Sequence, residues 1–370
     1  MAYWAKHRFL CQQRSSVRLL LWLWLMLAAG GAAAIAAESL SLYSATVPVQ
    51  EQSQSEERRA LRAGLAEVLV KLSGDRNALA QSEVAAALAS PRQYATSFGF
   101  AGEGEQRVMQ IDFAPQALDQ LLRRAQLTVW PAQRQPLLLW LQVDRLPRGR
   151  HWLDYNSDPD LLAVISEVMA ARGLPWRLPE FDLRDRLAVA DNRALLLDPL
   201  QLDRASLPYT DAARGPRWAA LRLVTRSDGS SRGSWVLRLG EELLQGELTA
   251  APEIDQWRQW LHAVVDRIAA SEAYLPVLQA DELALVIAAV EEMGSYRQLQ
   301  QVLAEIEPLR AVRLTSVDGY RVELAAKIEG DRDRVLQALL ASGYFRLADD
   351  AAQQSPAPDR LALIWRGGGE

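Results

Sequence analysis

The feature that most restricts how this chain can fold is the order of hydrophobic periodicities near its C-terminus. Strand-like and helix-like patterns alternate as strand, helix, strand, strand, helix, strand, at residues 283–290, 295–306, 312–316, 322–326, 332–341 and 344–347. The middle two strands flank Asp318 and Gly319, a dipeptide typical of a two-residue hairpin. The order βαββαβ predicts a ferredoxin-like module over residues 282–366, in which residues 361–365 add a final paired strand.

A second module, over residues 137–271, opens with a nearly continuous apolar strand. Residues 137–143 have the composition of a strand that is covered on both faces. We expect a helix over 159–172 with Asp158 as its N-cap. Residues 174–216 are Pro-rich and are predicted to be irregular. Three antiparallel strands and a closing helix are expected after them, at 218–224, 234–239, 243–248 and 257–268.

The N-terminal module is expected over residues 37–130. A capping-box signature begins at Ser53, and the helix behind it can end at Gly74. The other expected elements are an opening strand, a second helix, a hairpin and a last helix, at 40–43 with 47–49, 83–89, 98–113 and 115–125. The fold class is therefore mixed α/β (α+β), with three modules joined by linkers near 131–136 and 272–281.

Residues 1–36 have the three parts of a secretory signal peptide. Four basic residues and no acidic ones accompany an apolar run over 19–29, and Ala34-Ile35-Ala36 fits an A-x-A cleavage site. The alternative is an uncleaved anchor in the inner membrane, because the stretch 17–37 is long enough to span a bilayer. The two glycines and the alanines after the run favour cleavage, so we expect export to the periplasm.

Charge and cysteine content exclude several functional classes. Cleavage removes four basic residues and no acidic ones, which changes the formal net charge from −5 to −9. Such a chain lacks the positive footprint of non-specific nucleic-acid binding. The single cysteine, Cys11, leaves with the signal peptide. The mature chain then has no disulfide, no thiol nucleophile and no cysteine-based metal site.

Catalytic candidates are few. The histidines that remain after cleavage are His151 and His262, and no G-x-S-x-G motif supplies a nucleophile. We expect His151 in a polar loop and His262 at the edge of a helix face. Carboxylates around Asp154, Asp158 and Glu180 leave an acid-base hydrolase as an alternative. The sequence otherwise predicts a protein that is not an enzyme.

Alternating oxygen side chains from Asp154 to Asp160 match the start of a calcium loop. Position six of such a loop requires glycine, and here it is Pro159. The acid at position twelve is replaced by Ile165. Helix capping by Asp158 accounts for the same residues, so we expect no metal ion. No complete glycine-rich nucleotide motif occurs either, and no cofactor is expected.

Nine of the 12 tryptophans lie beyond the signal peptide, and most fall at positions expected to be buried. Trp152 and Trp176 are expected in irregular parts of the middle module, Trp152 in the polar loop that carries His151 and Trp176 in the Pro-rich stretch. They are the two candidate binding residues, because an exposed indole ring can stack on a sugar or a peptide. Trp260 lies at the edge of an apolar helical stripe and is a candidate for a contact between modules.

Several strings carry a resemblance to a known family. They are residues 68–76, residues 118–125, and Val129-Trp130 ahead of the apolar run at 137–141. With the exported N-terminus, they resemble the proteobacterial domain-of-unknown-function family 2066. The resemblance implies an uncharacterised envelope protein and supplies no catalytic residue. Ser73-Gly74-Asp75-Arg76 is its most distinctive string.

These observations predict a periplasmic, non-catalytic protein that binds or helps assemble an envelope partner. The partner is expected to be an envelope protein or a cell-wall component, for example one bound by strand addition at a sheet edge. Two alternatives stay open. One is an envelope hydrolase that uses carboxylates of the middle module. The other is a peptidoglycan or small-molecule binder that uses Trp152 and Trp176.

Overall fold

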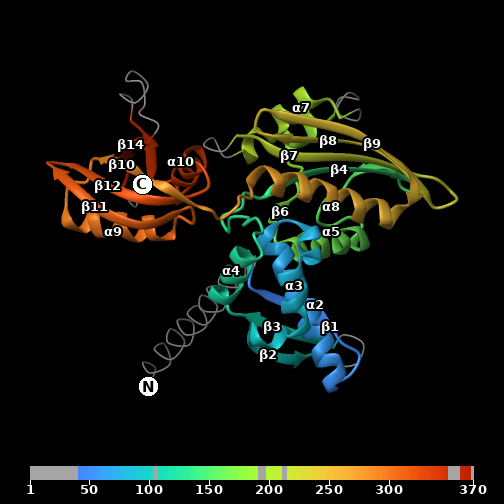
Figure 1. Ribbon diagram of the computed structural model, residues 1–370. Helices are drawn as coiled ribbons and strands as arrows, with labels where there is room; N and C mark the ends of the chain where they lie inside the picture. The colour runs from blue at the N-terminus through green and yellow to red at the C-terminus, as the bar shows by residue number, and fades with distance from the viewer. Residues whose placement is uncertain (1–40, 103–106, 191–196, 211–214, 349–358, 368–370) are drawn as a thin grey trace, which may run out of the picture. The chain divides into compact units, whose positions relative to one another are not determined.

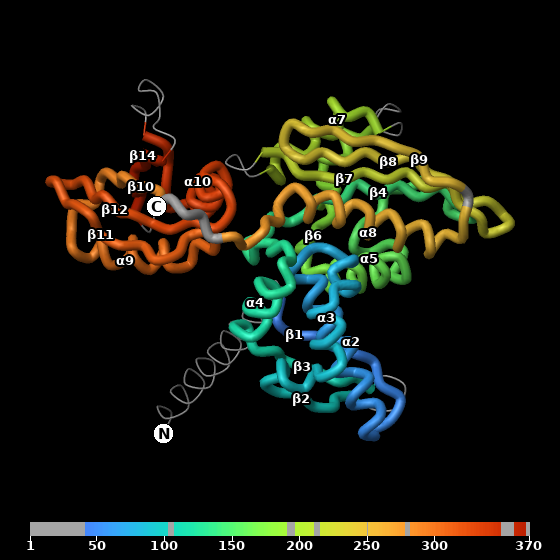
Figure 2. The backbone as a smooth tube through the Cα atoms, in the orientation of Figure 1, coloured from blue at the N-terminus to red at the C-terminus, as the bar shows by residue number. Residues whose placement is uncertain are grey.

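The computed structural model of the protein describes residues 41–102, 107–190, 197–210, 215–348 and 359–367. Within these residues, three consecutive segments each form a separate sheet, of three, six and five strands, and Figure 2 follows them from blue to red. The mixed α/β class is confirmed. The predicted signal peptide lies outside the described residues. Within the described ranges, no helix has both the length and the apolar character needed to cross a membrane.

The N-terminal segment packs helices against an antiparallel sheet of order β1-β3-β2. Ser53 accepts a hydrogen bond from the backbone N of Glu56 at 3.3 Å, as the capping signature predicts, and Gly74 ends the helix in the left-handed conformation. The opening strand starts later than expected. The elements are β1 (Ser44–Pro48), α2 (Gln54–Ser73), η1 (Arg76–Ala80), α3 (Ser82–Ala89), η2 (Pro91–Gln93), β2 (Ala95–Ala101), β3 (Val108–Phe113) and α4 (Pro115–Arg124).

The middle segment forms a mixed sheet of order β5-β4-β7-β8-β9, with the short strand β6 beside the start of β4. Strands β4 and β7 are parallel, and the β7-β8-β9 strands are antiparallel, as expected for the last three. The elements are β4 (Leu137–Arg145), β5 (Gly149–Trp152), α5 (Pro159–Arg172), β6 (Trp176–Arg177), α6 (Leu183–Ala188), α7 (Pro199–Ser206), η5 (Leu207–Tyr209), β7 (Arg217–Thr225), β8 (Ser230–Leu239), β9 (Glu242–Pro252) and α8 (Glu253–Glu272).

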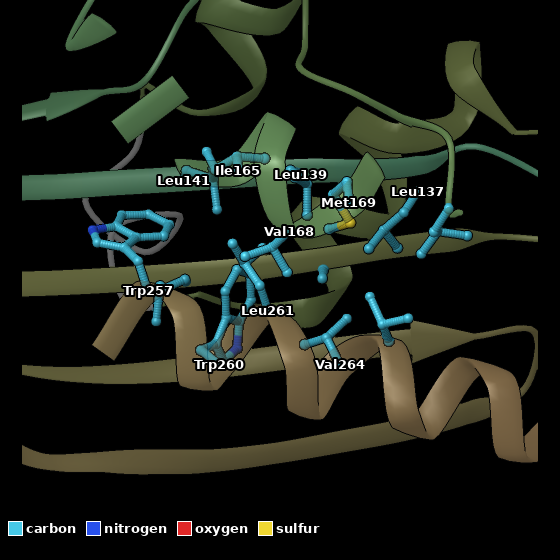
Figure 3. Packing of buried hydrophobic residues seen from close by; sticks show 14 of the residues in the cluster. Leu137, Leu139, Leu141, Ile165, Val168, Met169, Trp257, Trp260, Leu261 and Val264 are labelled. Atoms are coloured by element: carbon cyan, nitrogen blue, oxygen red, sulfur yellow. The ribbon is translucent and has the colours of Figure 1, made fainter. Parts of the chain in front are cut away.

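Both faces of this sheet are covered, as the apolar run of β4 predicts. Leu137, Leu139 and Leu141 pack toward α5 and α8 in the core drawn in Figure 3. Leu138 and Trp140 belong to a separate cluster on the face that carries α7 (Figure 1). Successive residues of a strand point to opposite faces, so β4 contributes to both cores. We name the two sides the α5/α8 face and the α7 face.

Two expectations for the middle segment are wrong. Residues 174–216 are not simply irregular, because they contain β6, α6 and α7. The two helices have six and eight residues, which is too short for a clear periodicity. Trp260 is not an edge residue either. Its side chain is buried in the α5/α8 core, edge-on to Trp257 with ring centroids 6.1 Å apart.

The distinctive string at the end of α2 contacts the middle segment. The carbonyl of Gly74 accepts a hydrogen bond from Nη2 of Arg172 at 2.9 Å, and Arg76 pairs with Asp266 at 2.6 Å. A Cβ atom on Gly74 would lie 2.6 Å from Cβ of Ala269 on α8. Glycine is therefore needed both for the left-handed helix end and for the close approach of α8.

The C-terminal segment contains the expected βαββαβ elements and one further strand. They are β10 (Leu278–Ala288), α9 (Met293–Glu305), β11 (Leu309–Asp318), β12 (Arg321–Glu329), α10 (Arg332–Ala341), β13 (Phe345–Leu347) and β14 (Arg360–Trp365). The sheet order is β11-β12-β10-β14-β13, and β14 runs parallel to β10. The added strand therefore lies inside the sheet. Its alternate residues Leu361, Leu363 and Trp365 are buried in the core of this segment.

Candidate functional site

Four side chains form a row across the α7 face of the middle sheet. Gln142 on β4 is the register partner of Trp152 on β5 and of Arg222 on β7, and Arg222 is the partner of Ser234 on β8. Register partners lie on the same face, about 4.8 Å apart. We call Trp152, Gln142, Arg222 and Ser234 the polar row. It follows directly after the apolar positions of this face, such as Trp140.

Gln142 is the most unusual member of the polar row. Its side chain is 0% exposed, and neither its Oε1 nor its Nε2 has a hydrogen-bond partner in the described part of the chain. Leaving one buried polar group unpaired costs about 1–3 kcal/mol. Buried polar atoms in native proteins nearly always find a partner, so an unpaired amide at this place calls for a functional explanation.

Arg222 lies beside Gln142, and no described residue supplies a counterion for it. Its Nε is buried and unpartnered, and no carboxylate pairs with its guanidinium among the residues that the structure describes. Other arginines on this face are paired: Nε of Arg150 lies 3.3 Å from Asp144, and Nε of Arg238 lies 3.0 Å from Asp203. A planar guanidinium suits a carboxylate or phosphate. Arg222 is therefore available for an anion.

Trp152 and Trp176, the two candidate binding residues, do not meet. Trp152 is partly buried on the α7 face, where its ring lies 6.0 Å from Trp140 and 6.3 Å from Phe181 between centroids. Trp176 is the register partner of Leu137 and packs against the α5/α8 core. Positions 137 and 142 of β4 point to opposite faces, so the two indoles cannot hold one ligand. Trp152 alone belongs to the polar row.

A second polar cluster ties the β4–β5 hairpin to α5 and α8. Nε2 of His151 lies 2.7 Å from Oδ2 of Asp158, and Arg145 donates to the same carboxylate. Arg145 also reaches Glu253 at 3.1 Å. Asp158 stands at the N-cap position of α5 with φ +42°, but its side chain makes no capping hydrogen bond. Asp158 is the N-cap residue of α5 as expected, but its side chain does not cap the helix, because the carboxylate pairs with His151 and Arg145 instead.

The pKa of Asp158 lies below its ordinary value. Burial acts in the opposite direction, and the hydrogen bonds from His151 and Arg145 outweigh it. The other nitrogen of His151, Nδ1, lies 3.0 Å from the carbonyl of Gly149. Both ring nitrogens are thus engaged, and neither is directed at a nucleophile. The cluster contains a histidine and a carboxylate, as an acid-base catalyst would. Its contacts, however, serve to hold the β4–β5 hairpin against α5 and α8.

No hydrogen bond or ion pair joins the remaining candidates to one another among the described residues. Oδ1 of Asp154 accepts a hydrogen bond from the backbone N of Asn156 at 2.8 Å, and Glu180 is exposed. His262 approaches Nη1 of Arg172 at 3.5 Å, and burial together with nearby arginines lowers its pKa. Over the described residues, no three His, Cys, Asp or Glu side chains are grouped so that they hold a metal ion.

A cavity of about 610 Å³ lies beside the two linkers, and its lining includes no residue of the polar row. Glu307 lines it and accepts a hydrogen bond from the backbone N of Ala132 at 3.1 Å. Burial raises the pKa of Glu307. The carboxylates around the cavity outnumber its arginines, so it does not suit an anion. They are Glu272, Glu305, Glu307, Asp331 and Asp333, against Arg217 and Arg334.

Sequence reasoning missed Gln142 and Arg222, although each leaves a trace. Gln142 is the one polar residue within the apolar run 137–143, and Arg222 interrupts the apolar strand 218–224 in the same way. Only the register of β4 against β7 shows that the two interruptions are neighbours. A search for polar residues inside predicted buried strands would have found both.

The comparisons with known proteins change the family assignment. Residues 36–131 match the family model described as Domain of unknown function (DUF8605). The resemblance to family 2066 is therefore wrong. The strings that suggested it are the end of α2 and the apolar face of α4, and such amphipathic segments recur in unrelated domains. No curated protein matches the chain. Over residues 36–131, the chain is similar to the domain of unknown function DUF8605.

Proposed function

We propose that this chain is a non-catalytic binding protein whose ligand carries an anionic group and contacts the polar row. One observation carries the proposal: Gln142 is buried with both amide atoms unpaired, directly beside Arg222, which has no acidic partner in the described chain. A ligand that pairs with both groups would recover the free energy that the folded protein loses by burying them.

The proposed location is the periplasm, and the proposed ligand is an envelope component. The basic start of the chain, the apolar run at 19–29 and the A-x-A site at 34–36 support export. The mass of the protein purified from envelope fractions tests cleavage. Cleaved protein begins after residue 36, whereas an anchored protein keeps residues 1–36 and stays with the membrane fraction.

An envelope hydrolase is the second candidate, and the contact between His151 and Asp158 is the observation that favours it. A catalytic base needs one ring nitrogen directed at the group that it deprotonates. Here Nδ1 faces the carbonyl of Gly149 and Nε2 faces Asp158, which favours binding over catalysis. A substrate screen decides: turnover that disappears in Asp158→Asn would support the hydrolase.

Titration with acetate and with inorganic phosphate tests the binding proposal, with sodium chloride added to hold ionic strength constant. We expect saturable quenching of tryptophan fluorescence in the wild-type protein and its loss in Arg222→Met. Arg232→Met is the matched control, because Arg232 is an exposed arginine on the same face. Equal responses in the two variants would contradict the proposal.

A further inference from the structure

We infer that the polar row binds the carboxyl-terminal end of a peptide, with its carboxylate at Arg222, its last amide at Gln142 and its preceding residues over Trp152. The inference rests on the proposed function and names the ligand class. It is drawn from the side-by-side placement of a guanidinium, a primary amide and an indole along one line of the sheet.

The guanidinium of Arg222 fixes the charged end of the ligand. Arginine pairs with a carboxylate through two parallel N–H donors, which suits a planar α-carboxylate. The next residue along the row beyond Ser234 is the exposed Glu247. Its negative charge disfavours an anionic ligand that extends over β9. The peptide is therefore expected to run from Arg222 toward Gln142 and not toward Glu247.

The amide of Gln142 distinguishes a peptide from a simple anion. Its Oε1 accepts a hydrogen bond and its Nε2 donates. The last residue of a peptide carries an N–H donor and a carboxylate acceptor on one short segment, so it can satisfy both atoms at once. Acetate offers only acceptors and leaves Oε1 unpaired. Because both atoms of Gln142 are unpartnered in the described chain, the peptide end is the better complement.

Trp152 sets the length of the bound segment. It is two strand spacings from Arg222, about 10 Å. An extended chain advances about 3.3–3.6 Å per residue, so this distance corresponds to about three residues. The partly exposed ring of Trp152 can cover apolar side chains of the residues that precede the terminus. The ligand is therefore a carboxyl-terminal tripeptide with small or apolar side chains.

Access to Gln142 requires a rearrangement of neighbouring side chains, because Gln142 is fully covered. Its two register partners, Trp152 and Arg222, are only partly buried. Rotamer changes at binding surfaces are common and fast. The inferred binding therefore includes a side-chain rearrangement at Trp152 or Arg222 that opens the amide.

Calorimetric titration of the purified protein with four probes tests the inference. The probes are acetyl-trialanine with a free carboxylate, the same peptide as its terminal amide, its D-alanine counterpart and acetate. We expect the L or D acid to bind at least tenfold more tightly than both acetate and the amide. Preference for the L form identifies the terminus of a protein, and preference for the D form identifies a cell-wall peptide.

Three variants locate the binding. Arg222→Met is expected to weaken the acid peptide at least tenfold, and Arg232→Met to leave it unchanged. Gln142→Leu is expected to weaken the peptide about tenfold but to leave acetate unaffected. Because Gln142→Leu is expected to be at least as stable as the wild type, a loss of peptide binding in this variant would not reflect a folding defect.

Two outcomes separate the inference from the proposal beneath it. If acetate and the acid peptide bind equally and both depend on Arg222, the peptide class is overturned and the anion proposal survives. If the peptide amide binds as tightly as the peptide acid in every variant, Arg222 does not recognise the negative charge. The anion proposal and the peptide inference then both fail.

Discussion

Gln142 on β4 and Arg222 on β7 are direct partners in the parallel register of the middle sheet, and both contribute buried polar atoms that lack a partner in the described chain. In a solvent-exposed pair of this kind, water would supply the missing hydrogen bonds and the free-energy cost would be small. Burial makes the arrangement costly, and a cost retained in a folded protein is typical of a functional site. The binding proposal follows from this cost.

Gln142→Leu is expected to raise the free energy of unfolding by about 1 kcal/mol, because it removes a buried amide that makes no hydrogen bond to any described residue. Urea unfolding at pH 7 measures the change. Gln256→Leu is the matched control. Gln256 is equally buried, but its Nε2 donates to the carbonyls of Ser231 and Thr249. That variant should lose stability, and a loss in both variants would contradict the account of Gln142.

Asp158→Asn is expected to lower the free energy of unfolding at pH 7 by about 2 kcal/mol, because the charge-assisted bonds to His151 and Arg145 are weakened. Asparagine accepts the left-handed backbone at this position, so the backbone conformation is kept. Asp160→Asn is the control, since Asp160 is an exposed acid in the first turn of the same helix. It should change stability by less than about 0.5 kcal/mol.

The stability difference between the wild type and Asp158→Asn is expected to depend on pH. A carboxyl whose pKa is lower in the folded than in the unfolded protein stabilises the fold above its ordinary pKa of 3.8, and this stabilisation is lost as the pH falls through the lower, folded value. Wild type and Asp158→Asn should therefore converge in stability below pH 3.8. A constant difference from pH 7 to pH 2 would show that the charge of Asp158 has no role.

Gly74→Ala should destabilise the protein by about 3 kcal/mol. A new Cβ would lie 2.6 Å from Cβ of Ala269, and φ of +74° adds backbone strain. Gly229→Ala separates these two contributions, because Gly229 also has a positive φ, +81°, but its Cβ would meet open space. We expect a loss of about 1 kcal/mol there. Equal losses in thermal unfolding would argue against a close contact between α2 and α8.

Local patterns predict much of this fold because local physics determines it. The run 137–143 requires a strand covered on both faces, and Leu137 to Trp140 alternate between two cores as expected. Gly74 ends α2 because glycine, which has no Cβ atom, readily adopts the left-handed conformation. The helices of the 174–216 region escape detection because they are short and draw stability from tertiary packing.

The candidate site depends on register, which the sequence does not contain. Trp152 is predicted as a binding residue from its residue type and its expected loop position. Arg222 lies far from it along the chain, and the two belong to one row only because the strands are ordered β5-β4-β7. Asp158 is a residue type that often caps helices, but its side chain bonds instead to His151 in the β4–β5 hairpin. Contacts between distant segments decide both cases.

The most direct test of the polar row is to observe its side-chain nitrogens during binding. In ¹⁵N NMR spectra, the Nε2 amide of Gln142 and the Nε–H of Arg222 are assigned by their absence in Gln142→Leu and Arg222→Met. On addition of acetyl-trialanine, we expect both signals to shift together and to saturate at the same peptide concentration. Saturable binding during which neither signal moves would place the ligand elsewhere and contradict the account.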